Sequence, residues 1–174
     1  MFVCETPRLF VRRLSPDDAA FLVQLLNESS FIQNIGDRGV RSLDDARAYV
    51  AKGPAASYEK YGFGLFHVSL KESREPIGMC GLLKRDWLQD VDVGFAFLPP
   101  YFGKGYASES AQAVIEWGRR EKGIQRVCGI TKADNTGSIR VLEKLGLKFE
   151  RFVTSPEGQE SRLFIPRSPQ SPGG

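Results

Sequence analysis

The sequence predicts a mixed α/β domain, in which a run of antiparallel strands is followed by a single right-handed β-α-β crossover. Strand-like segments at residues 62–70, 76–83 and 91–98 follow one another closely, and the polar stretch 71–75 forms the turn between the first two. A long helical pattern at residues 106–122 then separates this run from the next strand. We therefore expect the element order β-α-α-β-β-β-α-β-α-β-β.

The first part of the chain contains one strand and two helices. Residues 8–14 alternate between apolar and polar side chains and indicate a strand. The segment 15–18 starts the first helix, because it supplies a serine cap, a proline at the first helical position and acidic residues in the first turn. A second helix covers residues 42–52 and ends at Gly53-Pro54, whereas residues 29–41 are expected to be irregular.

The last part of the chain continues with a strand, a short helix and a hairpin. The expected boundaries are 126–131 for the strand, 138–145 for the helix, and 147–154 and 160–165 for the hairpin strands. The chain has 174 residues, which suits one domain, and we place that domain at residues 6–166. The stretch 167–174 is rich in Pro, Ser and Gly and is expected to be a disordered tail.

The ionisable residues exclude several classes of function. There are 24 Lys and Arg against 21 Asp and Glu, and the resulting charge of +3 is too small to indicate a nucleic-acid partner. Cys4, Cys80 and Cys128 form no C-x-x-C pair, and His67 is the single histidine, so we expect no metal site. Any Ser-His-Asp or Cys-His mechanism would depend entirely on that histidine.

The lack of long apolar segments and the unpaired cysteines lead us to expect a cytoplasmic protein. No apolar run approaches the roughly 20 residues that a membrane span needs. The first 13 residues lack the apolar core of a secretory signal. Three unpaired cysteines fit a reducing compartment. We therefore expect neither membrane association nor secretion.

The most informative stretch is a glycine-rich loop between the strand 91–98 and the long helix. After Pro99-Pro100 it reads Gly103-Lys104-Gly105, and glycines let a backbone turn tightly and approach a ligand closely. The helix that follows offers unpaired N–H groups and a positive dipole end. With Lys104 and Ser108 as additional donors, this stretch predicts a site for a phosphate or pyrophosphate.

Two common nucleotide-binding patterns fail in this loop. A Walker A loop is excluded because Leu98 and Tyr106 break its spacing. A Rossmann fingerprint is excluded because Ser108 stands where the third glycine belongs. A different type of nucleotide-binding enzyme is therefore disfavoured, and a plain strand-to-helix turn is the remaining alternative.

Two motifs in a fixed order resemble the GNAT superfamily of N-acetyltransferases, and most of all the branch that includes the ribosomal-protein N-terminal acetyltransferases. The first motif is PPYFGKGYASE at residues 99–109, and the second is NTGSIRVLEKLG at residues 135–146. One helix and one strand separate them, and the resemblance extends from Thr6-Pro7-Arg8-Leu9 to the final hairpin. It implies a GNAT-like, mostly antiparallel seven-stranded sheet with helices on both faces.

The resemblance also implies a reaction. Acetyl-CoA is the expected co-substrate, and its acetyl group passes directly to a primary amine, which belongs to a protein N-terminus or a small molecule. The expected assembly is a monomer or a homodimer. A non-catalytic acyl-CoA-binding module is the alternative, since one residue of the family's acid-base chemistry is missing.

In the family the sheet opens after the strand that corresponds to residues 91–97. The resemblance implies that pantetheine pairs with the backbone in this opening, and that loop amides hold the pyrophosphate. The implied coenzyme-binding residues are Phe95, Ala96, Phe97, Phe102, Gly103, Lys104, Gly105, Tyr106, Ala107, Ser108 and Asn135. Two positions depart from the family: Pro100 replaces a common Gln or Arg, and Leu142 replaces a common Tyr that protonates the thiolate.

The resemblance implies that Ser138, Asp92 and Asn135 are the site side chains, and each has a structural alternative. Ser138 is expected to donate to the coenzyme A thiolate, or else only to cap the short helix. Asp92 is the expected base, acting through water if burial raises its pKa from about 3.9, or else it is an exposed strand residue. Asn135 is expected to bond pantetheine, or else to form an Asx-turn.

Weaker candidates complete the set. Asp90, Glu109, Glu143 and His67 are lesser candidates for the base. The alternative for Glu109 and Glu143 is a solvated helix face, and the alternative for His67 is packing or hydrogen bonding within its strand. Residues 31–41 are the expected acceptor segment. Within it, Arg38 and Arg41 either grip an anionic acceptor or pair with Asp37 and Asp44, and Trp87 and Phe63 either line the acceptor cleft or belong to the core.

Overall fold

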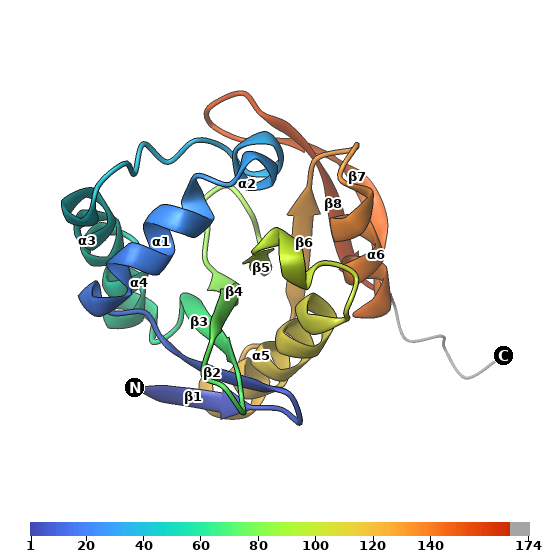
Figure 1. Cartoon of the computed structure of the whole chain (residues 1–174). Helices are drawn as coiled ribbons and strands as arrows, with labels where there is room; N and C mark the ends of the chain where they lie inside the picture. Colours follow the sequence, from blue (N-terminus) through green and yellow to red (C-terminus); the bar gives the residue numbers. More distant parts are fainter. Residues whose placement is uncertain (168–174) are drawn as a thin grey trace, which may run out of the picture.

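A computed structural model describes residues 1–167, which form one eight-stranded sheet with helices on both faces (Figure 1). The strand order is β1-β2-β3-β4-β5-β6-β8-β7, and all neighbours are antiparallel except β5 and β6. The strands are β1 (Phe2–Glu5), β2 (Leu9–Arg13), β3 (Leu65–Leu70), β4 (Pro76–Leu83), β5 (Val91–Phe97), β6 (Val127–Thr131), β7 (Leu147–Thr154) and β8 (Glu160–Pro166). The predicted mixed, mostly antiparallel sheet is confirmed. Apart from Arg167, the predicted tail lies outside the described residues.

The predicted number of seven strands is wrong, because β1 adds an eighth at the edge of the sheet. β1 pairs with β2 through Cys4↔Val11 and Glu5↔Phe10, with an irregularity between Phe2 and Cys4. A four-residue segment with such an interruption shows no alternation that sequence analysis can detect. The strand exists because β2 offers it a partner.

The helices are α1 (Ala19–Leu26), α2 (Ser29–Asn34), α3 (Leu43–Lys52), α4 (Pro54–Tyr61), α5 (Tyr106–Lys122) and α6 (Thr136–Lys144). A 3-10 turn at Pro16–Asp18 precedes α1, and its Ser15 cap is confirmed. Two predictions are wrong in this part of the chain: α2 forms within the segment 29–41 expected to be irregular, and α4 starts at Pro54. Pro54 does end α3, but proline also suits the first position of the next helix.

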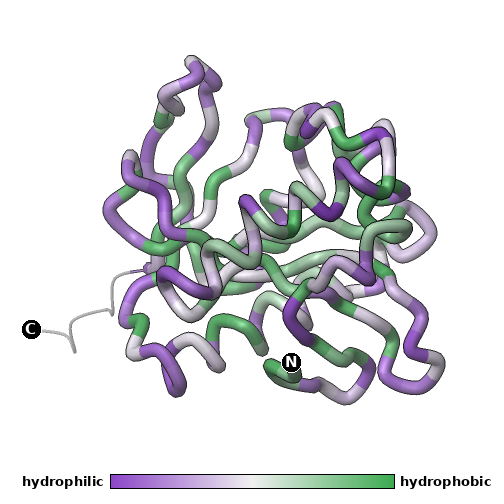
Figure 2. The backbone as a smooth tube through the Cα atoms, turned by 90° about the vertical axis from the view of Figure 1, so that its left-hand side faces the viewer, coloured by the Kyte–Doolittle hydropathy of each residue, from purple (hydrophilic) through white to green (hydrophobic). Residues whose placement is uncertain are grey.

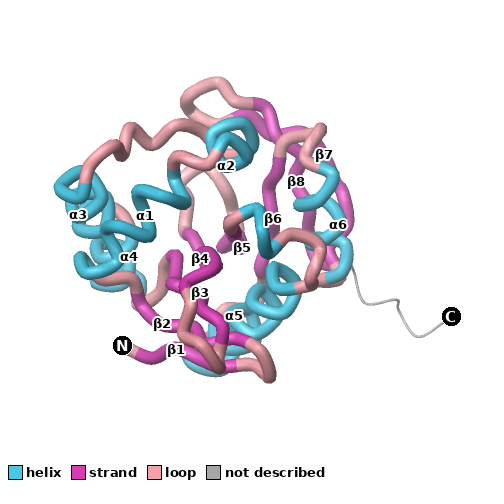
Figure 3. Tube along the Cα trace, in the orientation of Figure 1, coloured by secondary structure: helices cyan, strands magenta, loops and turns pink. Residues whose placement is uncertain are grey.

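The helices form two layers around the sheet. On one face α5 crosses β4 and β5, and Ala111, Val114 and Leu142 of α5 and α6 join the main core. On the other face α1 and α3 pack together over Met79 of β4. Figure 3 shows the strands between these helical layers, and Figure 2 shows hydrophobic residues along the strands and hydrophilic stretches in the outer turns. In residues 1–167, no helix is long and apolar enough to cross a membrane.

Phe66 of β3 is a central side chain of the main core. It is fully buried, stacks on Tyr58 with ring centroids 5.5 Å apart, and meets Trp117 of α5 edge-on at 5.3 Å. It therefore links α4, the sheet and α5. Aromatic pairs of this kind add to the stabilisation from buried area.

We expect Phe66→Ala to lower the free energy of unfolding by about 3–5 kcal/mol, because it removes a buried ring and leaves a cavity. Urea unfolding monitored by circular dichroism measures the change. Phe102→Ala is the matched control: its ring is 52% exposed, so the cost should stay within about 0.5 kcal/mol. Equal losses in the two variants would contradict the central place of Phe66.

Candidate active site

Strands β5 and β6 separate almost as soon as they meet. They pair only at Val91↔Val127 and Asp92↔Cys128, whereas β5 stays paired with β4 as far as Gly78↔Phe97. In the described part of the chain, the edge of β5 that faces away from β4 therefore has no partner strand after Asp92. Phe95, Ala96 and Phe97, the residues expected to pair with pantetheine, lie on this open edge.

The glycine-rich loop lies at the end of the open edge. Gly103 and Gly105 have φ angles of 73° and 83°, in the left-handed region that favours glycine. Gly105 is the N-cap of α5 and supplies no side-chain cap, so the first amides of the helix keep their free N–H groups. Within residues 1–167, the amides of Gly103 and Lys104 have no hydrogen-bond acceptor either. The loop thus presents a set of unpaired backbone donors.

The side chains around the loop are mostly exposed. Phe102 and Lys104 lie at its exposed tip, and Tyr106, Ala107 and Ser108 form the half-buried first turn of α5. Pro100 belongs to a short 3-10 helix, Pro99–Tyr101, and has no polar side chain to replace the Gln or Arg of the family. The backbone is therefore the main source of donors for an anion here.

Asn135 and Ser138 come together at the start of α6. Asn135 is the N-cap, and its Oδ1 atom accepts a hydrogen bond from the Ser138 amide at 3.2 Å. The helix therefore starts at Thr136, earlier than predicted, and the capping role considered for Ser138 belongs to Asn135. The hydroxyl of Ser138 makes no hydrogen bond within residues 1–167.

Leu142 cannot replace the missing tyrosine. Its side chain is 1% exposed and belongs to the main core. It also lies against the backbone of β6, since a Cβ atom on Gly129 would be only 2.5 Å from its Cδ2 atom. Leu142 is a packing residue, and its position supplies no proton donor.

Asp92 is a buried carboxylate at the point where β5 and β6 part. Its side chain is 1% exposed, so the alternative of an exposed strand residue is wrong. Burial raises its pKa from an ordinary value of 3.8 to about 6, against the opposing charge of Arg85. The Arg85 Nε atom lies 3.0 Å from Asp92 Oδ1. A carboxylate with such a pKa is a far better base near neutral pH than an ordinary aspartate.

Sequence reasoning missed Arg85. It lies in the connection between β4 and β5, just beyond the pair Leu83↔Asp92. The hairpin register therefore returns this cation to the side of Asp92. A prediction of the exact strand register would have been needed to find it.

The lesser candidates for the base are engaged elsewhere or lie on the surface. Asp90 pairs with Arg126 at 3.1 Å, and Glu109 pairs with Arg8 at 2.8 Å. Glu143 is exposed on α6. These contacts leave Asp92 as the buried carboxylate at the opening.

His67 belongs to a separate buried network. It is 4% exposed, its Nε2 atom lies 3.9 Å from Asp18 Oδ1, and its ring meets Phe21 edge-on. Burial, assisted by the charge of Arg12, lowers its pKa from 6.5 to about 4, so the ring is neutral at pH 7. His67 lies on β3, across β4 from the opening.

The expected acceptor segment is held by internal contacts. Arg41 forms an ion pair with Asp37 at 2.6 Å and donates to Asn27, as the alternative interpretation predicted. Asp44 pairs with Arg47 rather than with Arg41. These contacts shape the segment and occupy Arg41.

Two open depressions lie on the surface near these candidates. Arg38 lines a depression of about 400 Å³ with Tyr49 and Lys52. Trp87 lines another, of about 480 Å³, which includes Arg85, the partner of Asp92. The second depression is therefore lined by the ion-pair partner of Asp92, whereas Asp92 itself is 1% exposed.

Phe63 does not line an acceptor cleft. Its side chain is 7% exposed and packs in the core. For metal chemistry, residues 1–167 contain no group of three or more His, Cys, Asp or Glu side chains placed to hold an ion.

Comparison with known proteins gives consistent matches over most of the chain. A family model described as "Acetyltransferase (GNAT) domain" matches residues 8–148. A Bacillus subtilis protein named "Uncharacterized N-acetyltransferase YnaD" is 32% identical over 157 residues, which cover 89% of each chain.

Solved structures match as well. A GNAT-family acetyltransferase from Bacillus anthracis has a TM-score of 0.76 and 27% identity, covering 95% of this chain and 96% of its own. RimL, described as a ribosomal L7/L12 alpha-N-protein acetyltransferase in complex with coenzyme A, has a TM-score of 0.81 over 95% of this chain and 97% of its own. At 17% identity, RimL shows a shared fold.

The raised pKa of Asp92 predicts a pH dependence of stability. The folded protein holds the Asp92 proton up to about pH 6, whereas the ordinary pKa is 3.8, so this carboxyl makes folding less favourable as the pH rises through that window. Relative to wild type, we expect the free energy of unfolding of Asp92→Asn to increase by on the order of 3 kcal/mol between pH 4 and pH 7.

Urea unfolding of wild type and Asp92→Asn at each pH measures this difference. The opposite contribution of His67 is the same in both proteins and therefore cancels in the comparison. Asp44→Asn is the control, because it removes a carboxylate that is 93% exposed rather than buried. A constant difference between wild type and Asp92→Asn across the pH range would show that the pKa is not raised.

Proposed function

The chain belongs to the GNAT acetyltransferase family and is an N-acetyltransferase, and we propose that it transfers the acetyl group of acetyl-CoA directly to a primary amine. The observation that carries this proposal is the joint geometry of β5 and its loop. The strand has an open backbone edge beyond Asp92, and the edge leads to a loop with two left-handed glycines and unpaired amides. An extended amide chain with a pyrophosphate at one end matches both features.

In this proposal the backbone of Phe95, Ala96 and Phe97 pairs with the pantetheine amides. The pyrophosphate is held by the loop amides, with Lys104 and Ser108 as additional donors. The loop residues concerned are Phe102, Gly103, Lys104, Gly105, Tyr106 and Ala107. Asn135 accepts from the Ser138 amide through its Oδ1 atom, and its Nδ2 group makes no hydrogen bond within residues 1–167. In the proposal, Oδ1 caps the helix and Nδ2 donates to pantetheine.

The reaction needs only a few groups beyond correct positioning. The neutral amine nitrogen bonds to the acetyl carbonyl carbon, the C–S bond breaks, and the amine proton leaves through water to Asp92. Backbone amides at the opening stabilise the oxyanion, and the Ser138 hydroxyl donates to the thiolate sulfur. Holding amine and thioester side by side removes much of the entropic barrier, up to about 7–11 kcal/mol in intramolecular models.

The proposed acceptor is a protein N-terminus or a small-molecule amine. Both carry the primary amine that the reaction needs, and RimL, of similar fold, is described as acting on a protein α-amine. The depression that contains Trp87 and Arg85 is lined by the ion-pair partner of the proposed base, and it is the proposed place for the acceptor.

The proposal predicts release of free thiol when the protein is incubated with acetyl-CoA and an acceptor. The panel contains peptides with free N-termini and small primary amines, and mass spectrometry confirms a gain of one acetyl group. Gly105→Glu is the control, because it places a side chain on a left-handed residue and a negative charge in the pyrophosphate site, and it should abolish coenzyme binding. Coenzyme A binding without turnover on any amine would instead indicate an acyl-CoA-binding module.

Ser138→Ala tests the proposed thiolate donor. We expect kcat to fall by about 10- to 100-fold while the Kd for acetyl-CoA changes by less than about twofold, because the hydroxyl acts on charge that develops only in the reaction. Steady-state kinetics and calorimetry measure the two quantities. Ser73→Ala, in the turn between β3 and β4, is the matched control. Unchanged turnover in Ser138→Ala would remove this residue from the mechanism.

A further inference from the structure

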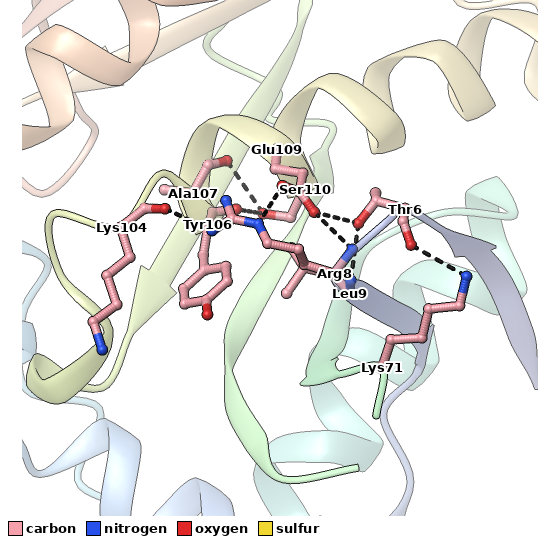
Figure 4. A network of polar contacts seen from close by, with 9 residues as sticks. All are labelled: Thr6, Arg8, Leu9, Lys71, Lys104, Tyr106, Ala107, Glu109 and Ser110. Carbon is pink, nitrogen blue, oxygen red and sulfur yellow. Dashed lines mark hydrogen bonds and ion pairs between the residues drawn. The ribbon is translucent and has the colours of Figure 1, made fainter. Parts of the chain in front are cut away.

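Arg8 connects the beginning of β2 to the glycine-rich loop and α5 (Figure 4). Its Nε atom lies 2.8 Å from Glu109 Oε1, and its Nη1 atom donates to the Lys104 carbonyl oxygen at 3.0 Å. The guanidinium also lies over the Tyr106 ring, 4.4 Å from its centroid. One side chain thus contacts the tip of the loop, the first residue of α5 and its first turn.

The glycine-rich loop has few other hydrogen bonds that fix its position, so the contact with Arg8 is important for it. Its entrance is held where the Leu98 amide donates to the Ile77 carbonyl at 2.9 Å. Within residues 1–167, the backbone at residues 99–105 forms hydrogen bonds with nearby residues of the chain, such as the Glu109 amide of α5 to the Gly105 carbonyl. The hydrogen bond from Arg8 is the one that comes from a distant part of the described chain. The hydrogen bond from Arg8 therefore fixes the direction of the Lys104 carbonyl.

Glu109 fixes Arg8 in turn. Its carboxylate accepts from the Thr6 hydroxyl and from the Arg8 amide, in addition to the guanidinium (Figure 4). Burial opposes this charge, but the hydrogen bonds from Thr6 and Arg8 and the charge of Arg8 lower the pKa of Glu109. Glu109 is thus anionic at neutral pH, one turn from amides suited to an anion, and Arg8 offsets its charge there.

We propose that Arg8 is a positioning residue for the coenzyme: it holds the Lys104 peptide and the first turn of α5 in the shape that binds pyrophosphate, and it neutralises Glu109 beside that site. This inference rests on the proposed function. A lysine at this position cannot replace it, because an ammonium group lacks the planar fork that contacts Glu109 and the Lys104 carbonyl together. The ion pair is half-exposed, so its loss should cost little global stability.

The test compares two acetyl donors, one with and one without the 3′-phospho-ADP portion that contains the pyrophosphate. We expect Arg8→Ala and Arg8→Lys to lower kcat/KM for acetyl-CoA by at least about tenfold, mainly through KM, and to raise the Kd for coenzyme A in calorimetry to the same degree. With S-acetylpantetheine, which carries no pyrophosphate, kcat/KM should change by less than about twofold. Arg47→Ala, which breaks a distant surface ion pair, should leave both donors unaffected.

The possible failures are distinguishable. An equal loss of kcat/KM with both donors would show general damage to the site. No loss with acetyl-CoA would show that the loop keeps its shape without Arg8. Either result overturns this inference but leaves the proposed function standing. Wild-type protein that does not bind coenzyme A would overturn the proposed function, and the inference with it. Melting temperatures close to wild type establish that the variants are folded.

Discussion

The separation of β5 from β6 is the constraint on which the rest of the structure depends. Two parallel strands joined by a helix normally pair along their length, but β5 and β6 form only two residue pairs. β5 stays with β4 over six pairs, while β6 turns to β8. The sheet therefore keeps one continuous core under α5 and still exposes a strand edge in its interior. That edge leads directly to the N-terminus of α5.

Two buried polar groups show how the sheet accommodates charge on the face opposite α5. Asp18 is paired by both guanidinium nitrogens of Arg12, at 2.7 and 2.9 Å, and its pKa is lowered. Within residues 1–167, the carboxylate of Asp92 has Arg85 as its single side-chain partner, and burial dominates, so its pKa is raised. The two aspartates illustrate one rule: several hydrogen bonds and charges together lower the pKa of a buried carboxyl, whereas burial raises the pKa of one with a single charged partner.

Contacts distant in sequence shape the site as strongly as the local motifs do. Arg8 and Glu109 are 101 residues apart, and Lys132, after β6, donates to the Gln33 carbonyl of α2 at 2.7 Å. The first contact supports the loop from the edge of the sheet. The second places α2 near the start of the connection to Asn135 and Ser138. Both arise only when the sheet has brought the two halves of the chain together.

The sequence by itself determined the features that local chemistry controls. The bounds of β4 and β7, the length of α5 between Gly105 and Gly123, and the left-handed glycines of the loop follow from periodicity, caps and turn residues. Asn135 and Ser138 were found because they belong to a recognisable motif, and Asp92 because of its place on the strand that opens in the family.

Only the tertiary structure decided the rest. β1 needs the edge of β2, and α2 and α4 are short helices whose apolar residues, Phe31 and Tyr58, are stabilised by packing. The raised pKa of Asp92 depends on burial against Arg85, and the hydrogen bond from Arg8 to the Lys104 carbonyl joins residues 96 positions apart. A local pattern reports the preferences of neighbouring residues, but burial and long-range pairing exist only once the strands are in register.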